Sequence, residues 1–250
     1  MSSNVLHVVG ERFTGFAIEN PEVITLPELE RMLLREELPS DVTLIVGQGI
    51  PDERLRQLQA SIERLPASKH VTLVTGPSAL ERAEPRLVHK HVEHNIMISA
   101  PEQVVEGERY VSRLVLDDRC AEMSDHVTGQ HLQGMVLVEA ARQMVLAVTE
   151  RYFLRDPGTR YFVMNQLDAT YHAFGFPLGM DVEYHGVSRT EGKGGSLTCE
   201  ARVCFIQGGE LLTEMKTRFG VYDTAFMRGV EAKKARQAIA RATPLLRKAG

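Results

Sequence analysis

The sequence has no excess of basic residues and no apolar run long enough to span a membrane. It contains 29 lysines and arginines against 33 aspartates and glutamates, so its formal net charge is −4 at pH 7. Proteins that bind nucleic acid through its phosphates carry a basic patch or a clear basic excess, so we expect no nucleic-acid partner. No apolar run approaches the roughly 20 residues that a membrane-spanning helix needs, so we expect no membrane partner.

Cysteine is scarce, and the first residues lack the features of a signal peptide. Cys120, Cys199 and Cys204 form an odd set without the spacing of a metal site. We expect them to be reduced structural thiols, and the sequence predicts neither a metal nor a cofactor. The start, from Met1 to His7, has no basic segment followed by an apolar core. The expected location is therefore the cytoplasm.

The first 85 residues alternate between short strands and helices. Strands are expected at 5–9, 42–46 and 71–75, and helices at 27–36 and 51–65. The second helix begins with Pro51 and has acidic residues in its first turn, as helix starts often do. Strands that alternate with helices favour a parallel sheet. We predict a small α/β domain over residues 1–85, which ends at a polar, proline-containing joint at 82–86.

The rest of the chain is predicted to form an antiparallel sheet. Strands are expected at 95–99, 110–117, 160–172, 180–187, 196–206 and 211–221. Glycine-containing turns at 192–195 and 207–210 join the last three strands as hairpins. These strands belong to a predicted domain over residues 86–225. The tail, 226–250, has largely helical spacing with several basic residues, which indicates a solvated helix.

One helix between these strands is apolar on every side. From Met135 to Val148 nearly every residue is Met, Val, Leu or Ala, which is typical of a helix enclosed by other structure. The polar exceptions, Glu139, Arg142 and Gln143, are spaced so that they lie on one side. A buried carboxylate is costly unless it is paired, so Glu139 is either neutralised by Arg142 or held there for chemistry.

The stretch DHVTGQHLQGMVLVEAARQ, residues 125–143, resembles the A-factor biosynthesis hotdog family of butenolide phosphate synthase-like proteins. The segment LVHKHVEHNIMIS, residues 87–99, is similar to the strand that opens a hotdog unit in that family. More distantly, His126 and Gly129 followed by Gly134 and Glu139 resemble the site pattern of hotdog hydroxyacyl-carrier-protein dehydratases, without its two prolines and with one residue fewer between the glycines. The resemblance implies an α+β protein, in which a C-terminal hotdog fold, an antiparallel sheet wrapped around a central helix, follows the small α/β domain.

The start of the central helix can polarise an acyl thioester without a metal, through N–H groups that have no partner inside the helix. Glu139, one turn further on, acts as a base if burial raises its pKa. Two loop histidines are further candidates, although each also fits a packing role. The expected catalytic residues are Glu139, His131 and His126, and the expected substrate-binding residues are Gly129, Gln133, Gly134, Met135, Arg142 and Gln143.

Two other kinds of site are disfavoured. His89, His91 and His94 suggest a metal site, but alternation along a strand would separate their side chains, and the resemblance implies a structural role. Ser124, Asp125 and His126 contain the residue types of a hydrolase triad, yet neighbours in sequence rarely point at one another.

The resemblance implies a protein that processes acyl chains on acyl carrier protein or coenzyme A. The expected reaction transfers a β-ketoacyl group to the hydroxyl of a small acceptor. The helix amides near Gly134 would hold the oxyanion, Glu139 or a histidine would deprotonate the acceptor, and Arg142 would attract a phosphate or fix Glu139. The alternatives are a dehydratase or thioesterase of the same fold, and a non-catalytic acyl-binding module.

The expected assembly is a homodimer. A single hotdog sheet leaves one edge strand open, and open edges pair readily with another chain. Members of the family resemble chains with two hotdog units, whereas this sequence has one central helix. We therefore expect the sheets of two copies to join edge to edge, with an acyl site at the subunit interface. The competing expectation is a monomer in which the α/β domain replaces the second hotdog unit.

Overall fold

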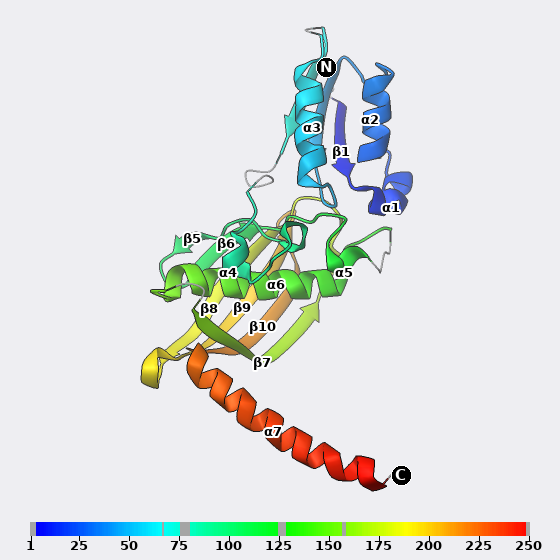
Figure 1. Ribbon diagram of the computed structural model, residues 1–250. Helices are drawn as coiled ribbons and strands as arrows, with labels where there is room; N and C mark the ends of the chain where they lie inside the picture. The colour runs from blue at the N-terminus through cyan, green and yellow to red at the C-terminus, as the bar shows by residue number, and fades with distance from the viewer. Residues whose placement is uncertain (1–3, 67, 76–80, 125–128, 157–158, 249–250) are drawn as a thin grey trace.

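The chain forms two units, each built around a sheet, and a projecting C-terminal helix. The computed structural model describes residues 4–66, 68–75, 81–124, 129–156 and 159–248, with side chains described to residue 242. In Figure 1 the smaller N-terminal unit lies above a larger sheet that carries a long helix, and the last helix extends away below them.

The N-terminal unit is a parallel sheet with helices, as the alternating pattern predicts. Its strands are β1 (Asn4–Val9), β2 (Val23–Thr25), β3 (Asp41–Val46) and β4 (His70–Val74), in the order β2-β1-β3-β4. All three pairings are parallel, because a helical crossover separates each strand from the next. The crossovers contain η1 (Glu11–Phe13), α1 (Thr14–Glu19), α2 (Leu26–Leu34) and α3 (Asp52–Glu63). The short strand β2 was not predicted.

The larger unit is a six-stranded antiparallel sheet in the order β5-β6-β8-β9-β10-β7. Its strands are β5 (Glu102–Val105), β6 (Arg109–Arg113), β7 (Arg160–Tyr171), β8 (Asp181–Glu191), β9 (Leu197–Gln207) and β10 (Glu210–Asp223). The β9–β10 hairpin turns on Gly208 and Gly209, which both have positive φ as a tight hairpin turn requires. The predicted hairpins and antiparallel pairing are confirmed.

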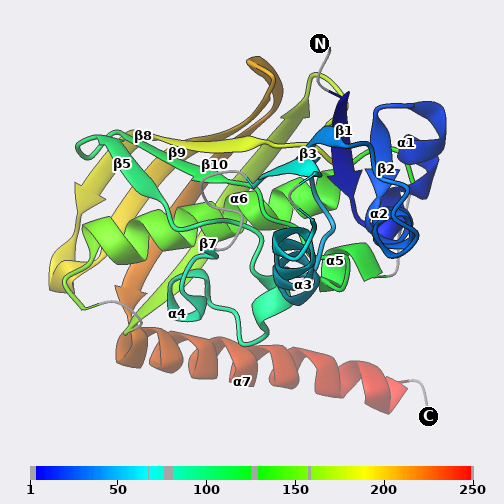
Figure 2. The same ribbon diagram turned by 90° about the horizontal axis from the view of Figure 1, so that it is seen from above.

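The central helix is α6 (Gly134–Val148), and Figure 2 shows the strands curving around it. Ala140, Met144 and Val148 are fully buried, which agrees with the apolar circumference of the helix. A π-helical turn, η3 (Thr149–Phe153), continues it. Shorter helices, α4 (Pro85–Val88), η2 (Glu93–Asn95) and α5 (Ala121–Ser124), lie before α6, and η4 (Lys193–Gly195) lies between β8 and β9. The hotdog arrangement of sheet and helix is confirmed.

The segment 87–99 is not the predicted strand. α4 ends at Val88, His89 adopts a left-handed conformation with φ 54°, and only isolated bridges at Ile98 and Ser99 follow. The reason is a side chain of α6. The Gln143 amide accepts from the N–H of Met97 at 2.8 Å and donates to the carbonyl of Asn95 at 2.8 Å, so these backbone groups bond to the helix and not to a neighbouring strand. The first strand of the large sheet is instead β5, which was not predicted.

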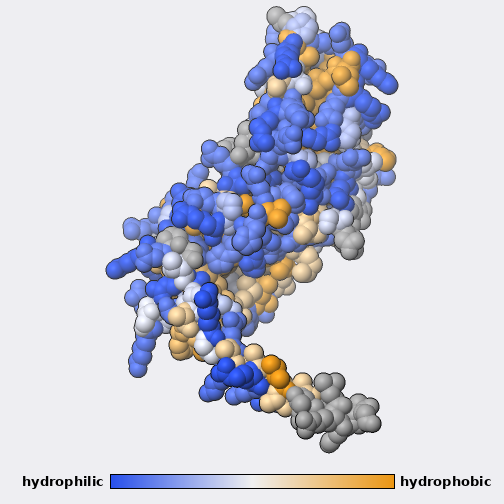
Figure 3. Space-filling view, viewed as in Figure 1, coloured by the Kyte–Doolittle hydropathy of each residue, from blue (hydrophilic) through white to orange (hydrophobic). Residues whose placement is uncertain are grey.

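The tail is helical, as its spacing predicts. α7 (Thr224–Lys248) is exposed along most of its described length, and Figure 3 shows hydrophilic and hydrophobic side chains side by side on it. In the described part of the chain, no helix combines the length and apolarity that crossing a membrane requires.

Buried polar contacts join the two units. Gln48, which follows β3, donates to the carbonyl of Leu114 at 2.9 Å and accepts from the N–H of Leu116 at 2.8 Å. Arg82 forms a two-point ion pair with Asp52 and also donates to the carbonyl of Val115. Phe13 and Phe16 of the N-terminal unit lie in the same apolar cluster as α6. The domain boundary at residue 85 stays a prediction, and the contacts across it are extensive.

We expect the substitution Gln48→Ala to lower the free energy of unfolding by about 2 to 4 kcal/mol, because it leaves two buried backbone groups without partners. The matched control is Gln57→Ala on the exposed face of α3, which should change stability by less than about 0.5 kcal/mol. Urea unfolding of both variants measures the difference. Equal losses would contradict a stabilising role for the Gln48 bridge.

Candidate functional site

A cavity of about 710 Å³ opens at the start of α6. One wall is the loop that enters α6 together with the first turn of the helix. The other is the end of β7 with the segment that follows it. The lining consists of residues 131–135, 137, 171–175 and 213. Leu132, Leu137, Ala173 and Phe174 make much of this lining apolar, which suits a hydrocarbon chain.

The first turn of α6 presents backbone donors at this cavity. Gln133, the residue before the helix, has an extended backbone, and its side chain makes no capping hydrogen bond. Among the described residues, the N–H groups of Gly134 and Met135 have no acceptor. The positive end of the helix dipole lies at the same place. The free donors lie where the sequence analysis places an oxyanion, and that role stays a prediction.

Tyr171 explains why position 134 is glycine. The Tyr171 hydroxyl donates to the carbonyl of Gly134 at 3.1 Å. A β-carbon at position 134 would lie 2.8 Å from the hydroxyl oxygen of Tyr171. A larger residue would therefore push the end of β7 away from the helix. The close approach of Gly134 and Tyr171 holds the two walls of the cavity together.

The loop before α6 carries the other predicted residues. His131 lines the cavity, and its ring packs against Phe174 with centroids 4.7 Å apart. Gly129 lies outside the lining; its carbonyl accepts from the N–H of Phe16 at 2.8 Å, which ties the loop to α1. His126 lies outside the described residues.

Glu139, Arg142 and Gln143 form a separate cluster that does not line the cavity. Arg142 binds both carboxylate oxygens of Glu139 at 2.7 Å, and Gln143 donates to the same carboxylate at 3.0 Å. Lys90, just beyond α4, approaches it at 2.9 Å and also lies 3.6 Å from Glu122 of α5. The Glu139 side chain is 15% exposed, and Gln143 is fully buried. Of the two predicted roles of Arg142, the structure shows the ion pair with Glu139, and contact with a phosphate stays a prediction.

The condition for Glu139 to act as a base, a pKa raised by burial, is not met. Burial does favour the neutral acid, but the hydrogen bonds from Arg142, Gln143 and Lys90 outweigh burial and lower the pKa to about 2. A carboxylate with so low a pKa is a weak base near neutral pH, because proton affinity and basicity fall together. The sequence analysis foresaw pairing with Arg142 but not the second cation, Lys90.

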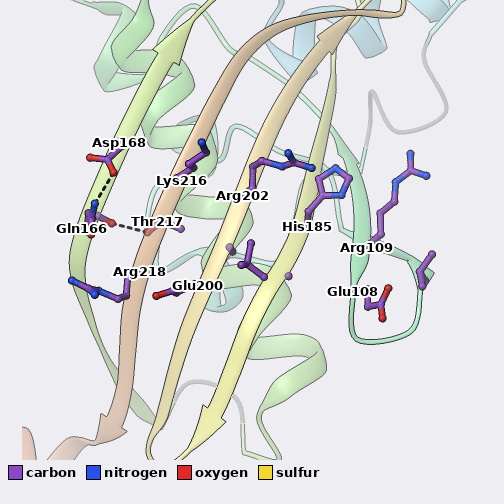
Figure 4. Close-up of a pocket in the computed structure, with 14 residues that line it drawn as sticks. Glu108, Arg109, Gln166, Asp168, His185, Glu200, Arg202, Lys216, Thr217 and Arg218 are labelled. Atoms are coloured by element: carbon purple, nitrogen blue, oxygen red, sulfur yellow. Dashed lines mark hydrogen bonds between the residues drawn. The ribbon is translucent and has the colours of Figure 1, made fainter.

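A second hollow, of about 650 Å³, lies on the face of the sheet that faces away from α6 (Figure 4). Arg109, His185, Arg202 and Lys216 are register partners on four neighbouring strands, so three cationic side chains and an imidazole lie side by side. Glutamates compensate them: Arg109 lies 2.6 Å from Glu183, and Arg202 and Lys216 both contact Glu214. This balanced set of charges is typical of a solvated sheet face.

The His89 side chain does not join a metal site. It lies 2.9 Å from the fully buried carboxylate of Glu150 and packs edge-on against Phe162. Within the ranges that the structure describes, no three His, Cys, Asp or Glu side chains converge as metal ligands would.

The family model described as the A-factor biosynthesis hotdog domain matches residues 72–223, which is more than half of the chain. The chain belongs to this family. The suspected resemblance is thereby confirmed. The match begins inside β4, the last strand of the N-terminal sheet, and ends at the last residue of β10.

This A-factor biosynthesis hotdog protein is also similar to several solved structures, at low identity. A putative thioesterase, a phenylacetic acid degradation-related protein from Ralstonia eutropha, is 14% identical, covering 48% of this chain and 82% of its own, with a TM-score of 0.35. S. sahachiroi AziG is 14% identical, with coverages of 50% and 91% and a TM-score of 0.39. A thioesterase from Haemophilus influenzae is 12% identical, with coverages of 54% and 84% and a TM-score of 0.38. No curated protein matches the chain.

Several residues in or beside the candidate site were not assigned by the sequence analysis, among them Lys90, Tyr171 and Thr213. Lys90 lies within the family-like segment 87–99, and this position was the only sequence signal that could have linked it to the site. The strand pattern allowed Tyr171 to line an acyl channel, but an ordinary polar position on a strand was the favoured interpretation. Thr213 lines the cavity from β10, and nothing in its local sequence distinguishes it from other strand threonines.

We expect Glu139→Gln to lower the free energy of unfolding by a value on the order of 3 kcal/mol at neutral pH. The reason is that the folded protein stabilises the ionised carboxylate of Glu139 more than the unfolded chain does. The depressed pKa sets the pH window. The wild-type protein should lose this stability as the pH falls from about 4.5 toward 2, and the two proteins should converge there. Chemical denaturation at several pH values measures it.

The control is Glu28→Gln, which alters an exposed carboxylate on α2. Its stability should follow that of the wild-type protein across the whole pH range. A constant difference between Glu139→Gln and wild type from neutral to acid pH would contradict the lowered pKa.

Proposed function

We propose that this protein processes acyl thioesters, with the acyl chain in the cavity and the thioester carbonyl at the start of α6. The observation that carries this proposal is the pair of free N–H groups, Gly134 and Met135, at the mouth of a largely apolar cavity. Such donors stabilise the negative charge that develops on a carbonyl oxygen under nucleophilic attack. The apolar lining suits the chain that follows the carbonyl.

The reaction we propose is transfer of a β-ketoacyl group from carrier protein or coenzyme A to a small hydroxyl acceptor. The acceptor oxygen attacks the carbonyl carbon, and a C–O bond forms while the N–H groups hold the oxyanion. The C–S bond then breaks as the oxyanion collapses. The products are an acyl ester and the free thiol of the carrier, which receives the proton that the hydroxyl loses.

His131 is the base that this geometry favours. It lines the cavity at the end of the loop that enters α6, whereas Glu139 is held by three donors away from the lining. We propose that His131 takes the hydroxyl proton and returns it to the leaving thiolate. Glu139 would serve as a fixed anion that orients Lys90 and Arg142 beside the helix. Substrate contacts would come from Gln133, Gly134 and Met135.

Product analysis tests this function directly. Purified protein is incubated with a β-ketoacyl thioester, with and without a triose phosphate as the hydroxyl acceptor, and quenched in acid. We expect an acyl ester that forms only with the acceptor. A free acid in both samples would identify a thioesterase, and an enoyl product from the matching hydroxyacyl thioester would identify a dehydratase. Binding without turnover would leave an acyl-binding module and contradict acyl transfer.

Replacement of His131 by Asn should lower kcat by about 10² to 10⁴, because the variant keeps the shape of the ring but cannot carry a proton. Initial rates at saturating thioester measure the change. His70→Asn, on the outermost strand of the N-terminal sheet, is the control and should retain full turnover. An unchanged kcat in His131→Asn would exclude His131 as the base.

We further propose that two copies assemble through β7. This strand of 12 residues forms one end of the large sheet, so one side of its backbone has no strand partner among the described residues. From Met164 to Tyr171 every residue except Leu167 is exposed. Met135, at the start of α6, is 66% exposed. An open edge of this length favours pairing with a second sheet, which would bring the partner to the cavity.

Light scattering at micromolar concentration tests the assembly. We expect a mass twice the 27.9 kDa of one chain, with activity that falls on dilution, because the proposed site lies next to the open edge. A mass near 27.9 kDa at full activity would contradict the dimer and favour a monomer in which the α/β unit replaces the second hotdog unit.

A further inference from the structure

Thr213 is a buried hydroxyl without a protein partner. Its residue is 0% exposed, and its Oγ1 makes no hydrogen bond to any residue that the structure describes. Buried hydroxyls are usually paired, because removing one from water without a new partner costs free energy. Thr213 is one of the lining residues of the cavity at the start of α6, so an acyl chain that parts this lining enough to reach the hydroxyl can supply the missing partner.

A bulge in β10 brings Thr213 to this position. The register of β10 shifts between Leu211 and Thr213. The carbonyl of Leu212 accepts from the N–H groups of both His172 and Ala173, at 2.8 and 3.2 Å. A bulge turns the following side chains relative to the rest of the strand, and bulges often do so beside ligand sites. Here the distortion lies where β10 passes the end of β7.

The place of Thr213 relates it to a particular part of an acyl chain. Thr213 is the register partner of Tyr171, and the Tyr171 hydroxyl reaches the carbonyl of Gly134. Tyr171 therefore links Thr213 to the start of α6, where the thioester carbonyl is proposed to bind. In the same lining, Leu132, Leu137 and Ala173 cannot pair with an oxygen on the chain, the Tyr171 hydroxyl already donates to Gly134, and His172 is the other polar side chain at this end of β7.

We propose that Thr213 donates its hydroxyl hydrogen to the oxygen on the third carbon of the acyl chain, and so selects 3-oxoacyl thioesters over saturated ones. The inference rests on the proposed function, because it places the thioester carbonyl at α6. A site built to pair with a substrate oxygen rejects the analogue that lacks it, since its own polar group then stays unpaired in the complex.

The test uses binding, so it does not depend on turnover. The probes are amide analogues of 3-oxooctanoyl-pantetheine and octanoyl-pantetheine, in which nitrogen replaces the thioester sulfur. Isothermal titration calorimetry gives both dissociation constants for each protein. The wild-type protein should bind the 3-oxo probe at least about tenfold more tightly, and Thr213→Val should lose this preference. Thr213→Ser, which keeps the hydroxyl, should retain it.

The matched control is Thr217→Val on the same strand. Thr217 is also buried, but its hydroxyl donates to the carbonyl of Gln166 at 3.0 Å and lies outside this cavity. This variant should keep the wild-type preference. Thermal unfolding of Thr213→Val should match that of the wild-type protein, because no protein hydrogen bond is removed.

The outcomes separate the two proposals. If the wild-type protein binds both probes equally, the role of Thr213 is overturned while an acyl site at α6 stands. A preference for the 3-oxo probe that survives in Thr213→Val would likewise overturn the role of Thr213 and leave the acyl site at α6 standing. If the wild-type protein binds neither probe, the proposed function is overturned, and the inference about Thr213 falls with it.

Discussion

The arrangement around the central helix depends on the side-chain amide of Gln143. It is fully buried, and its three hydrogen bonds reach the N–H of Met97, the carbonyl of Asn95 and the carboxylate of Glu139. A buried amide must satisfy both of its ends, so these partners fix the path of the chain that leads into the sheet. Lys90, earlier in the same segment, also contacts the Glu139 carboxylate, at 2.9 Å. One amide thereby holds the backbone of segment 95–97 and, together with Arg142 and Lys90, lowers the pKa of a carboxylate one turn away.

Local patterns were sufficient for elements whose burial is regular. The apolar circumference of α6, the alternation of strands and helices in the N-terminal unit, and the glycine turns before β9 and β10 each follow from periodicity and turn chemistry. The segment 87–99 did not follow, because the N–H of Met97 and the carbonyl of Asn95 bond to the Gln143 side chain, which leaves only isolated bridges at Ile98 and Ser99. A strand pattern cannot reveal such a partner. The short strands β2 and β5 were missed because three or four residues carry little periodic signal.

The site was predictable only where its residues are neighbours in sequence. The helix start and His131 lie on one continuous stretch, so their proximity follows from the chain itself. Lys90, Tyr171 and Thr213 come from elements far apart in sequence, and only the fold brings them to α6. The pKa of Glu139 shows the same limit. The direction of the pKa shift depends on whether cations from elsewhere in the chain outweigh burial. One of these cations, Lys90, is about fifty positions away along the chain.

The N-terminal α/β unit supports the two walls of the cavity from outside the lining. The N–H of Phe16 in α1 holds the carbonyl of Gly129 on the loop that carries His131. The ring of Phe16 stacks on Phe176 at 5.3 Å, one residue beyond the opposite wall, which ends at Gly175. One residue of the α/β unit thus touches both segments that border the cavity. Since a base acts only when it is held within hydrogen-bond reach of its proton, the α/β unit is part of what positions His131, although none of its residues lines the cavity.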